Sequence, residues 1–113
     1  MDILFHEKMY QNGYSEKKIE KIRKKIQKLS PKLNLFLITL PIGPEGILEI
    51  YWYPELLQPL YRRSPEKMIV VGIAASREDA YELVEQIIQD IGWNEGTISV
   101  RDYFEERVCY YPY

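Results

Sequence analysis

Two segments with helical periodicity frame the middle of this 113-residue chain. In residues 15–29 and again in residues 76–92, aliphatic side chains recur at spacings of three and four, which places them along one stripe of a helix. Ser15 and Ser76 stand at the expected N-caps, and Gly92 stands where the second helix should end. Because each stripe must be buried against another element, the segments between the two helices have to supply a sheet.

Three apolar runs between these helices predict the strands. Residues 33–40 form an apolar run that is too short for a helix and too continuously apolar for a strand with one face exposed to solvent, so they predict a central strand. Turn-forming prolines and glycines follow, and residues 47–53 then form a second strand, so the two runs should pair as an antiparallel hairpin. Residues 54–66 are a connector with a possible helical turn at 55–58, and residues 67–74 give the strongest strand signal.

This order predicts an α+β fold in which three strands form an antiparallel meander and the two long helices pack on one face. The length fits a single domain covering residues 1–113. The C-terminal part should add a short helix through Tyr103 and Phe104, which we favour over an edge strand at residues 97–103. The alternative is a ferredoxin-like fold, which needs residues 2–6 as its first strand and leaves one strand over.

Charge is unevenly distributed along the chain. Residues 1–75 carry 12 Lys and Arg against 8 Asp and Glu, whereas residues 76–113 carry 3 against 9. The solvent side of the first predicted helix is made of lysines and that of the second of carboxylates. Oppositely charged neighbours attract, so we expect the two helices to lie side by side with their charged faces adjoining.

The composition argues against several classes of function. Cys109 is the only cysteine, so one chain can form no disulfide and has too few soft ligands for a structural zinc. His6, the only histidine, is far from Cys109 in sequence and forms no recognisable catalytic pair with it. Charges interrupt the short apolar stretch at the start of the sequence, so we expect no signal peptide there, and no apolar run is long enough to span a membrane. We therefore expect a cytoplasmic protein that is not an enzyme and holds no cofactor or metal.

Part of the sequence resembles small bacterial proteins of the Clostridia type. The residues that carry the likeness are Leu40, Leu57-Gln58-Pro59-Leu60-Tyr61-Arg62-Arg63, Val70-Val71-Gly72-Ile73-Ala74 and Val100-Arg101-Asp102-Tyr103-Phe104. They fall within residues 37–104, a little over half the chain. The resemblance implies a bacterial cytosolic protein, and since the group has no assigned activity it transfers no functional residues.

Cations and rings converge at one end of the predicted meander. The residues expected there, as candidates for binding an anion or another ligand, are Arg62, Arg63, Lys67, Tyr61 and Trp93. Cations beside stackable rings suit single-stranded nucleic acid or a phosphorylated ligand. The competing interpretation, which we favour, is that the arginines stabilise the negative end of the second helix and stack on tyrosines.

A second cluster predicts a homodimer. Two helices on one face of a meander leave the other face uncovered, and aromatic residues are enriched in interface cores. The interface candidates are Trp52, Tyr51, Tyr53, Tyr110 and Tyr111. Our leading hypothesis is a small non-catalytic interaction or regulatory module with an unidentified protein partner. The alternative is a nucleic-acid-associated protein using the basic helix and the Arg62/Arg63 corner, although we expect nucleic-acid binding to be weak at physiological salt.

Overall fold

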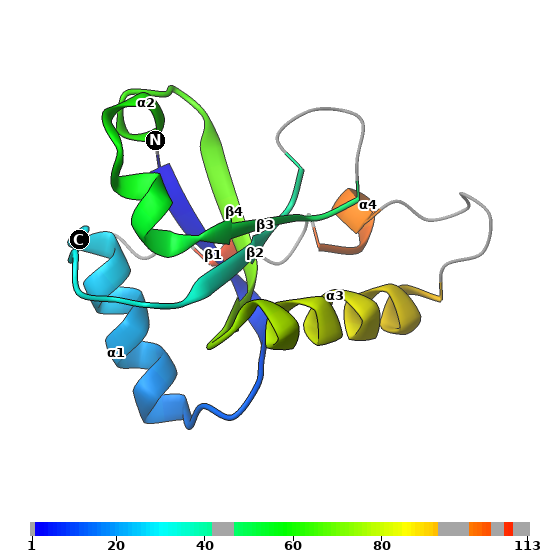
Figure 1. The fold of residues 1–113 in the computed structure, drawn as a ribbon. Coiled ribbons are helices and arrows are strands. Elements are labelled where there is room, and N and C mark those ends of the chain that lie inside the picture. The colour runs from blue at the N-terminus through cyan, green and yellow to red at the C-terminus, as the bar shows by residue number, and fades with distance from the viewer. Residues whose placement is uncertain (1, 42–46, 93–99, 105–107, 110–113) are drawn as a thin grey trace.

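The computed structural model describes residues 2–41, 47–92, 100–104 and 108–109. Figure 1 shows a single twisted sheet with helical elements on both sides. The elements, in chain order, are β1 (Asp2–Gln11), α1 (Glu16–Gln27), β2 (Phe36–Thr39), β3 (Glu49–Trp52), the 3-10 helix η1 (Tyr53–Leu57), α2 (Pro59–Arg62), β4 (Lys67–Ala74), α3 (Arg77–Ile91), α4 (Val100–Phe104) and β5 (Val108–Cys109).

Both long helices form as predicted, each with a side-chain cap at its start. The Ser15 hydroxyl accepts the N–H of Lys18 at 3.2 Å, and the Ser76 hydroxyl accepts the N–H of Asp79 at 3.1 Å. Helix α3 ends at Gly92, whose φ of 68° is the left-handed conformation that glycine adopts without a steric cost.

Helix α1 ends in a tight turn just before Pro31. The N–H of Ser30 donates to the carbonyl of Lys25 at 2.9 Å, and the N–H of Leu29 donates to that of Ile26 at 2.9 Å. This is the Schellman pattern, which needs a left-handed residue after the helix. Leu29 takes that position with a φ of 54°, which is costly for a residue that has a Cβ.

Three strands and the short C-terminal helix are confirmed. Strands β2 and β3 form the predicted antiparallel hairpin, in which Phe36 pairs with Trp52 and Thr39 with Glu49. Strand β4 covers residues 67–74 as expected. The segment 100–104 is the helix α4, so the alternative of an edge strand there is wrong. The connector holds more structure than one turn, since η1 and α2 fill most of it.

The predicted meander is wrong. The strand order is β3-β2-β4-β1-β5, so β2 lies between β3 and β4, which are its two antiparallel partners. The chain therefore leaves β3, passes over β2 through η1 and α2, and enters β4 on the far side. A crossover of this kind needs a dozen or more residues, which the connector provides.

The ferredoxin-like alternative correctly required a strand at residues 2–6, but its topology is also wrong. Neighbouring strands of a ferredoxin-like sheet are antiparallel, whereas β1 and β4 are parallel. Their pairing is irregular, because Phe5 lies opposite Val70 while Tyr10 lies opposite Gly72. Three extra residues of β1 are thus accommodated in a bulged stretch.

The two long helices cover opposite faces of the sheet, which corrects the prediction that they lie side by side. One core joins Ile22 and Ile26 of α1 to Leu37, Val70 and other sheet residues, and includes part of η1. The other core joins α3 and α4 to the opposite sheet face, including Ile38 and Val71. Figure 1 shows α1 and α2 on one side of the strands and α3 and α4 on the other. Neither face of the sheet is left bare as the meander implied.

Candidate interaction surface

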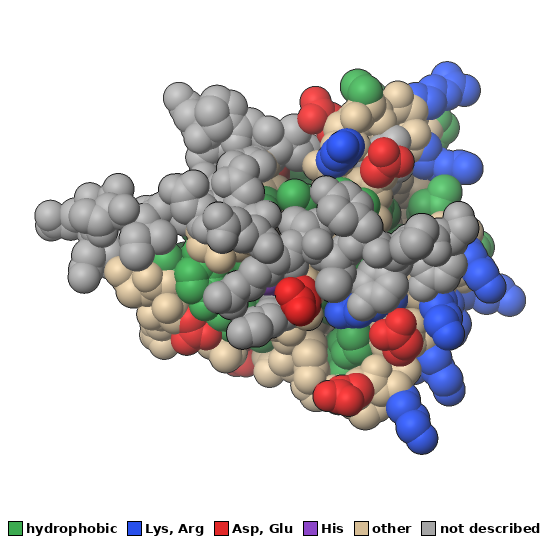
Figure 2. Space-filling view, turned by 180° about the vertical axis from the view of Figure 1, so that it is seen from behind, with side chains coloured by type: hydrophobic (Ala, Val, Ile, Leu, Met, Phe, Trp, Pro, Cys, Tyr) green, Lys and Arg blue, Asp and Glu red, His purple; other side chains and the backbone are tan. Residues whose placement is uncertain are grey.

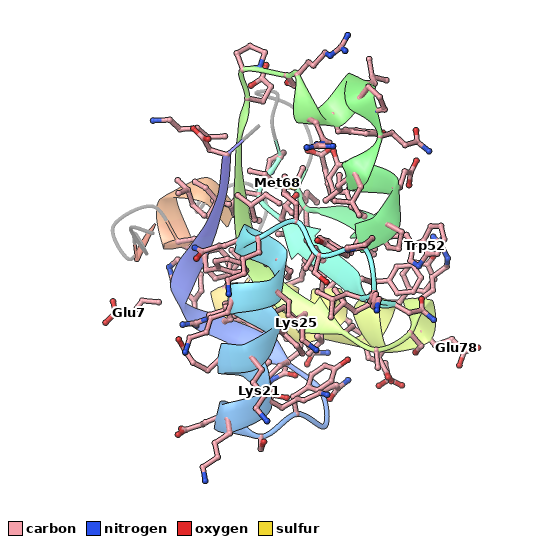
Figure 3. The ribbon with its side chains drawn as sticks, turned by 90° about the vertical axis from the view of Figure 1, so that its left-hand side faces the viewer. Glu7, Lys21, Lys25, Trp52, Met68 and Glu78 are labelled. Atoms are coloured by element: carbon pink, nitrogen blue, oxygen red, sulfur yellow. The ribbon has the colours of Figure 1, made fainter. Side chains whose placement is uncertain are left out.

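The outer side of α1 is rich in lysines. Helix α1 contains six Lys and Arg against two Glu. Six lysines are exposed on or beside it and define what we call the lysine face: Lys17, Lys18, Lys21, Lys24, Lys25 and Lys28. Figure 3 shows Lys21 and Lys25 projecting outward from α1, away from the sheet. Seen from behind, Lys and Arg gather along the side of the molecule that α1 and α2 occupy (Figure 2).

Helix α3 presents the opposite charge on the opposite side of the sheet. It carries one Arg against five Asp and Glu, and its exposed carboxylates, called here the acidic face, are Glu78, Glu82, Glu85 and Asp90. The sheet lies between the two helices, although their first turns approach each other, since burial and then the charge of Asp79 raise the pKa of Tyr14, just before α1. Since the screening length at physiological salt is about 8 Å, the acidic face does little to neutralise the lysine face. The protein is therefore electrostatically two-sided.

Arg23 is the one cation of α1 that turns inward. It is 9% exposed, its guanidinium lies 5.9 Å from the centroid of the Phe5 ring, and it pairs with Glu20 at 3.7 Å. Beside it, a cavity of about 390 Å³ opens between β1 and α1. Its lining is three carboxylates, one amide, one guanidinium and two apolar side chains: Glu7, Glu16, Glu20, Gln11, Arg23, Met9 and Ile19. Among these described lining residues there is no Ser, Thr, Cys, His or Lys.

The predicted ligand corner is only partly assembled. Arg62 and Arg63 are both exposed and, with Pro59, line a depression of about 360 Å³ at the end of α2. Lys67 is exposed at the start of β4. Tyr61 points the other way: it packs against the core under α1, and its ring centroid lies 6.2 Å from that of Tyr51. Trp93 falls outside the described residues.

The aromatic residues predicted to form an interface differ in how much of each side chain is exposed. Tyr53 is a core residue with no exposed surface, and its hydroxyl donates to the Ser30 carbonyl at 2.8 Å, so its assignment to an interface is wrong. Tyr51 is half-buried and donates to Glu49 at 2.8 Å. Trp52 is 43% exposed, with its indole N–H donating to Asn34 at 3.0 Å. Tyr110 and Tyr111 fall outside the described residues.

Buried tyrosines resist ionisation in this protein. Burial raises the pKa of Tyr53 above its usual value near 10. Burial, followed by the hydrogen bond to Glu49, raises the pKa of Tyr51 further. Tyr10 donates to Asp90 at 2.7 Å, and burial together with that bond raises its pKa strongly. Two of these phenols join separate segments: Tyr53 reaches the turn after α1, and Tyr10 of β1 reaches Asp90 of α3.

The lone histidine has a structural partner. His6 is 1% exposed, its Nε2 lies 2.9 Å from the carbonyl oxygen of Phe104, and its ring meets the Phe104 ring edge-on at 4.8 Å. The β1–β5 register pairs Cys109 with Phe5 and Val108 with His6. The histidine thus docks α4 onto the sheet.

Among the described residues, no group of three or more His, Cys, Asp and Glu is placed to hold a metal ion. No helix in the described ranges is long and apolar enough to cross a membrane. Comparison of the chain with protein-family models, curated proteins and solved structures finds no match. The proposals below therefore rest on the geometry alone.

Sequence reasoning located the lysine face but missed the cavity and the role of His6. Both depend on β1, whose mixture of charged and apolar residues carries no clean period of two. The lysine face, in contrast, lies on a single helix and is read directly from the spacing of its aliphatic stripe.

Proposed function

We propose that this protein is a small non-catalytic interaction module that docks an anionic surface of a protein partner onto its lysine face. The observation that carries the proposal is the placement of α1 and α3 on opposite faces of the sheet. The lysines have no acidic helix beside them, so their charge is directed at whatever approaches that side. Complementary charge of this kind speeds encounter and selects partners.

Two features favour an acidic protein surface over nucleic acid. The outward cations of α1 are all lysines, since its only arginine is turned inward against Phe5. Base recognition draws on exposed rings. Trp52 and Tyr81, both exposed, belong to β3 and α3, and Tyr61 of the Arg62/Arg63 corner is engaged with Tyr51.

A nucleic-acid-associated function is the second candidate, and one observation favours it. Because the acidic face lies across the sheet, it would not repel a polyanion that approaches α1. Binding through phosphates alone would be unselective and steeply dependent on salt.

A matched pair of variants tests the proposal. Lys21→Glu/Lys25→Glu reverses two charges on the lysine face, and Arg62→Glu/Arg63→Glu makes the same change in net charge at the other cationic corner. Binding of fluorescent poly-glutamate and of a 20-nucleotide single strand is measured by anisotropy at about 150 mM salt. We expect the first variant to weaken poly-glutamate binding at least about tenfold and the second to change it less than about threefold.

Three results would count against this assignment. If wild-type protein does not bind poly-glutamate, or if both variants weaken it equally, the lysine face is not a docking surface. If the oligonucleotide binds at sub-micromolar concentration with a steep salt dependence that Arg62→Ala/Arg63→Ala flattens, the nucleic-acid candidate replaces it. Circular dichroism of each variant confirms that α1 is still folded.

A further inference from the structure

Strand β3 forms one outer edge of the sheet. The N–H of Tyr53, just after the strand, donates to the Leu35 carbonyl at 2.9 Å, so its backbone groups face β2. Alternate residues of an antiparallel strand face the same neighbour, so Tyr51 and Glu49 also face β2. The backbone N–H and C=O groups of Ile50 and Trp52 therefore face outward, where another strand can pair with them.

The described strand β3 lacks two features that commonly prevent an edge from pairing with another strand. Monomeric sheets protect their edges with Lys, Pro or inward-pointing charges, and Glu49–Trp52 contains neither Lys nor Pro. Its one charged side chain, Glu49, accepts the Tyr51 hydroxyl at 2.8 Å. Trp52 is 43% exposed, and Ile47 just before the strand is 39% exposed. Figure 3 shows Trp52 projecting away from α1, on a different side of the molecule from Lys21 and Lys25.

We propose that β3 pairs antiparallel with β3 of a second copy of this chain, with Tyr51 on the two-fold axis. In this register Ile50 of each copy lies opposite Trp52 of the other, and their outward backbone groups form the hydrogen bonds of the new ladder. Aliphatic–aromatic and Tyr–Tyr pairs are favourable across strands. The only charge, Glu49, falls opposite position 53 rather than opposite itself. The strand is self-complementary, which is why a second copy, rather than an unrelated strand, is the fitting partner.

The pairing determines where the helices of the dimer lie. Residues opposite each other in a sheet face the same side, so the two-fold axis runs perpendicular to the sheet. Both α1 helices then cover one side of a ten-stranded sheet and both α3 helices cover the other. The two lysine faces would share one side of the dimer, so a single anionic partner could engage both. The dimer itself does not depend on the function proposed above.

Cysteine cross-linking tests the register. Cys109→Ala removes the only native cysteine, and Tyr51→Cys is added in that background. In the proposed register, residue 51 of one copy lies opposite residue 51 of the other, and the two form no hydrogen bonds with each other. Their Cα atoms would be about 4.5 Å apart, a distance that a disulfide can span. We expect mild oxidation to cross-link this variant almost completely. Trp52→Cys in the same background is the matched control and should remain uncross-linked, whereas an equal mixture of Trp52→Cys and Ile50→Cys chains should cross-link.

Solution mass tests the interface without cysteines. Light scattering at high micromolar concentration should give twice the chain mass of 13.5 kDa. Trp52→Lys places a cation on the edge and should raise the dimer dissociation constant at least about tenfold. Leu60→Lys, at an apolar side chain that is 78% exposed on α2, should leave it unchanged.

Defined results would overturn the proposal. A mass of 13.5 kDa with no cross-link at position 51 would show that β3 does not self-pair. A dimer that survives Trp52→Lys and is not cross-linked at position 51 would use another surface, which equally refutes it. Far-ultraviolet circular dichroism and a thermal melt establish that each variant is folded.

Discussion

The hydroxyl of Tyr53 should hold together two segments that the sequence does not suggest are neighbours. Tyr53 begins η1, and its hydroxyl donates to the carbonyl of Ser30, just after α1, at 2.8 Å. Tyr53→Phe keeps the ring in the core and removes only this bond. A buried hydrogen bond contributes about 1 kcal/mol, so the free energy of unfolding at pH 8 should fall by about that amount.

The stability difference between the wild-type protein and Tyr53→Phe should decrease in alkali. Burial raises the pKa of Tyr53 in the folded protein, whereas the unfolded chain ionises near pH 10. The stability that comes from keeping the phenol neutral is fully present below pH 10 and is lost as the pH rises above it. The phenylalanine variant has no phenol to ionise, so its stability lacks this pH dependence. The stability difference between the two proteins should therefore become smaller as the pH rises above about 10.

Urea denaturation followed by circular dichroism between pH 8 and pH 11 measures both quantities. The other tyrosines are common to the two proteins and cancel in the difference. Tyr81→Phe, which removes a hydroxyl from a side chain that is 55% exposed, is the control at pH 8 and should change the free energy of unfolding by less than about 0.5 kcal/mol. A Tyr53→Phe difference that stays constant up to pH 11 would refute the idea that this phenol is shielded from ionisation.

Two further substitutions probe the sheet. Gly72→Ala should lower the free energy of unfolding by about 1–3 kcal/mol, because a Cβ there would lie 3.0 Å from Cδ1 of Ile38. Adding Ile38→Val to this variant should recover part of the loss. If Gly72→Ala has the same urea midpoint as the wild-type protein, the packing of Gly72 against Ile38 is not tight. Thr39→Val should raise the free energy of unfolding by about 1 kcal/mol, because the hydroxyl is fully buried with no hydrogen-bond partner among the described residues. A destabilised Thr39→Val protein would reveal a partner for that hydroxyl.

The elements that could be predicted from the sequence are those whose pattern is local. The caps of α1 and α3, the β2–β3 hairpin and strand β4 each follow from spacing, capping residues or an uninterrupted apolar run. Strand β1 does not, although it is a long central strand, because Glu7 and Lys8 interrupt its apolar residues and the bulge between Phe5 and Tyr10 breaks the alternation. Without β1 the remaining three strands suggested a meander, and that error placed both helices on one face.

For the candidate surfaces, too, local features were predictable from the sequence and features that depend on the topology were not. The lysine face belongs to one helix, so its position on the surface was predictable, but its separation from the acidic face depends on the topology. Tyr53 was assigned to an interface because neighbouring aromatics of a strand look alike in sequence. In the structure the chain turns into η1 after Trp52, which leaves Trp52 at the edge and carries Tyr53 into the core.

A two-sided charge distribution also limits how copies of the chain can associate. A contact between the lysine face of one copy and the acidic face of the next would be head-to-tail, because the two surfaces lie on opposite faces of the sheet. Such contacts do not close at two subunits and, without a rotation that forms a ring, continue into a filament. They would also consume the surface we assign to a partner. Pairing through β3 closes at two chains and uses neither charged face, so it is the mode of self-association that is compatible with docking.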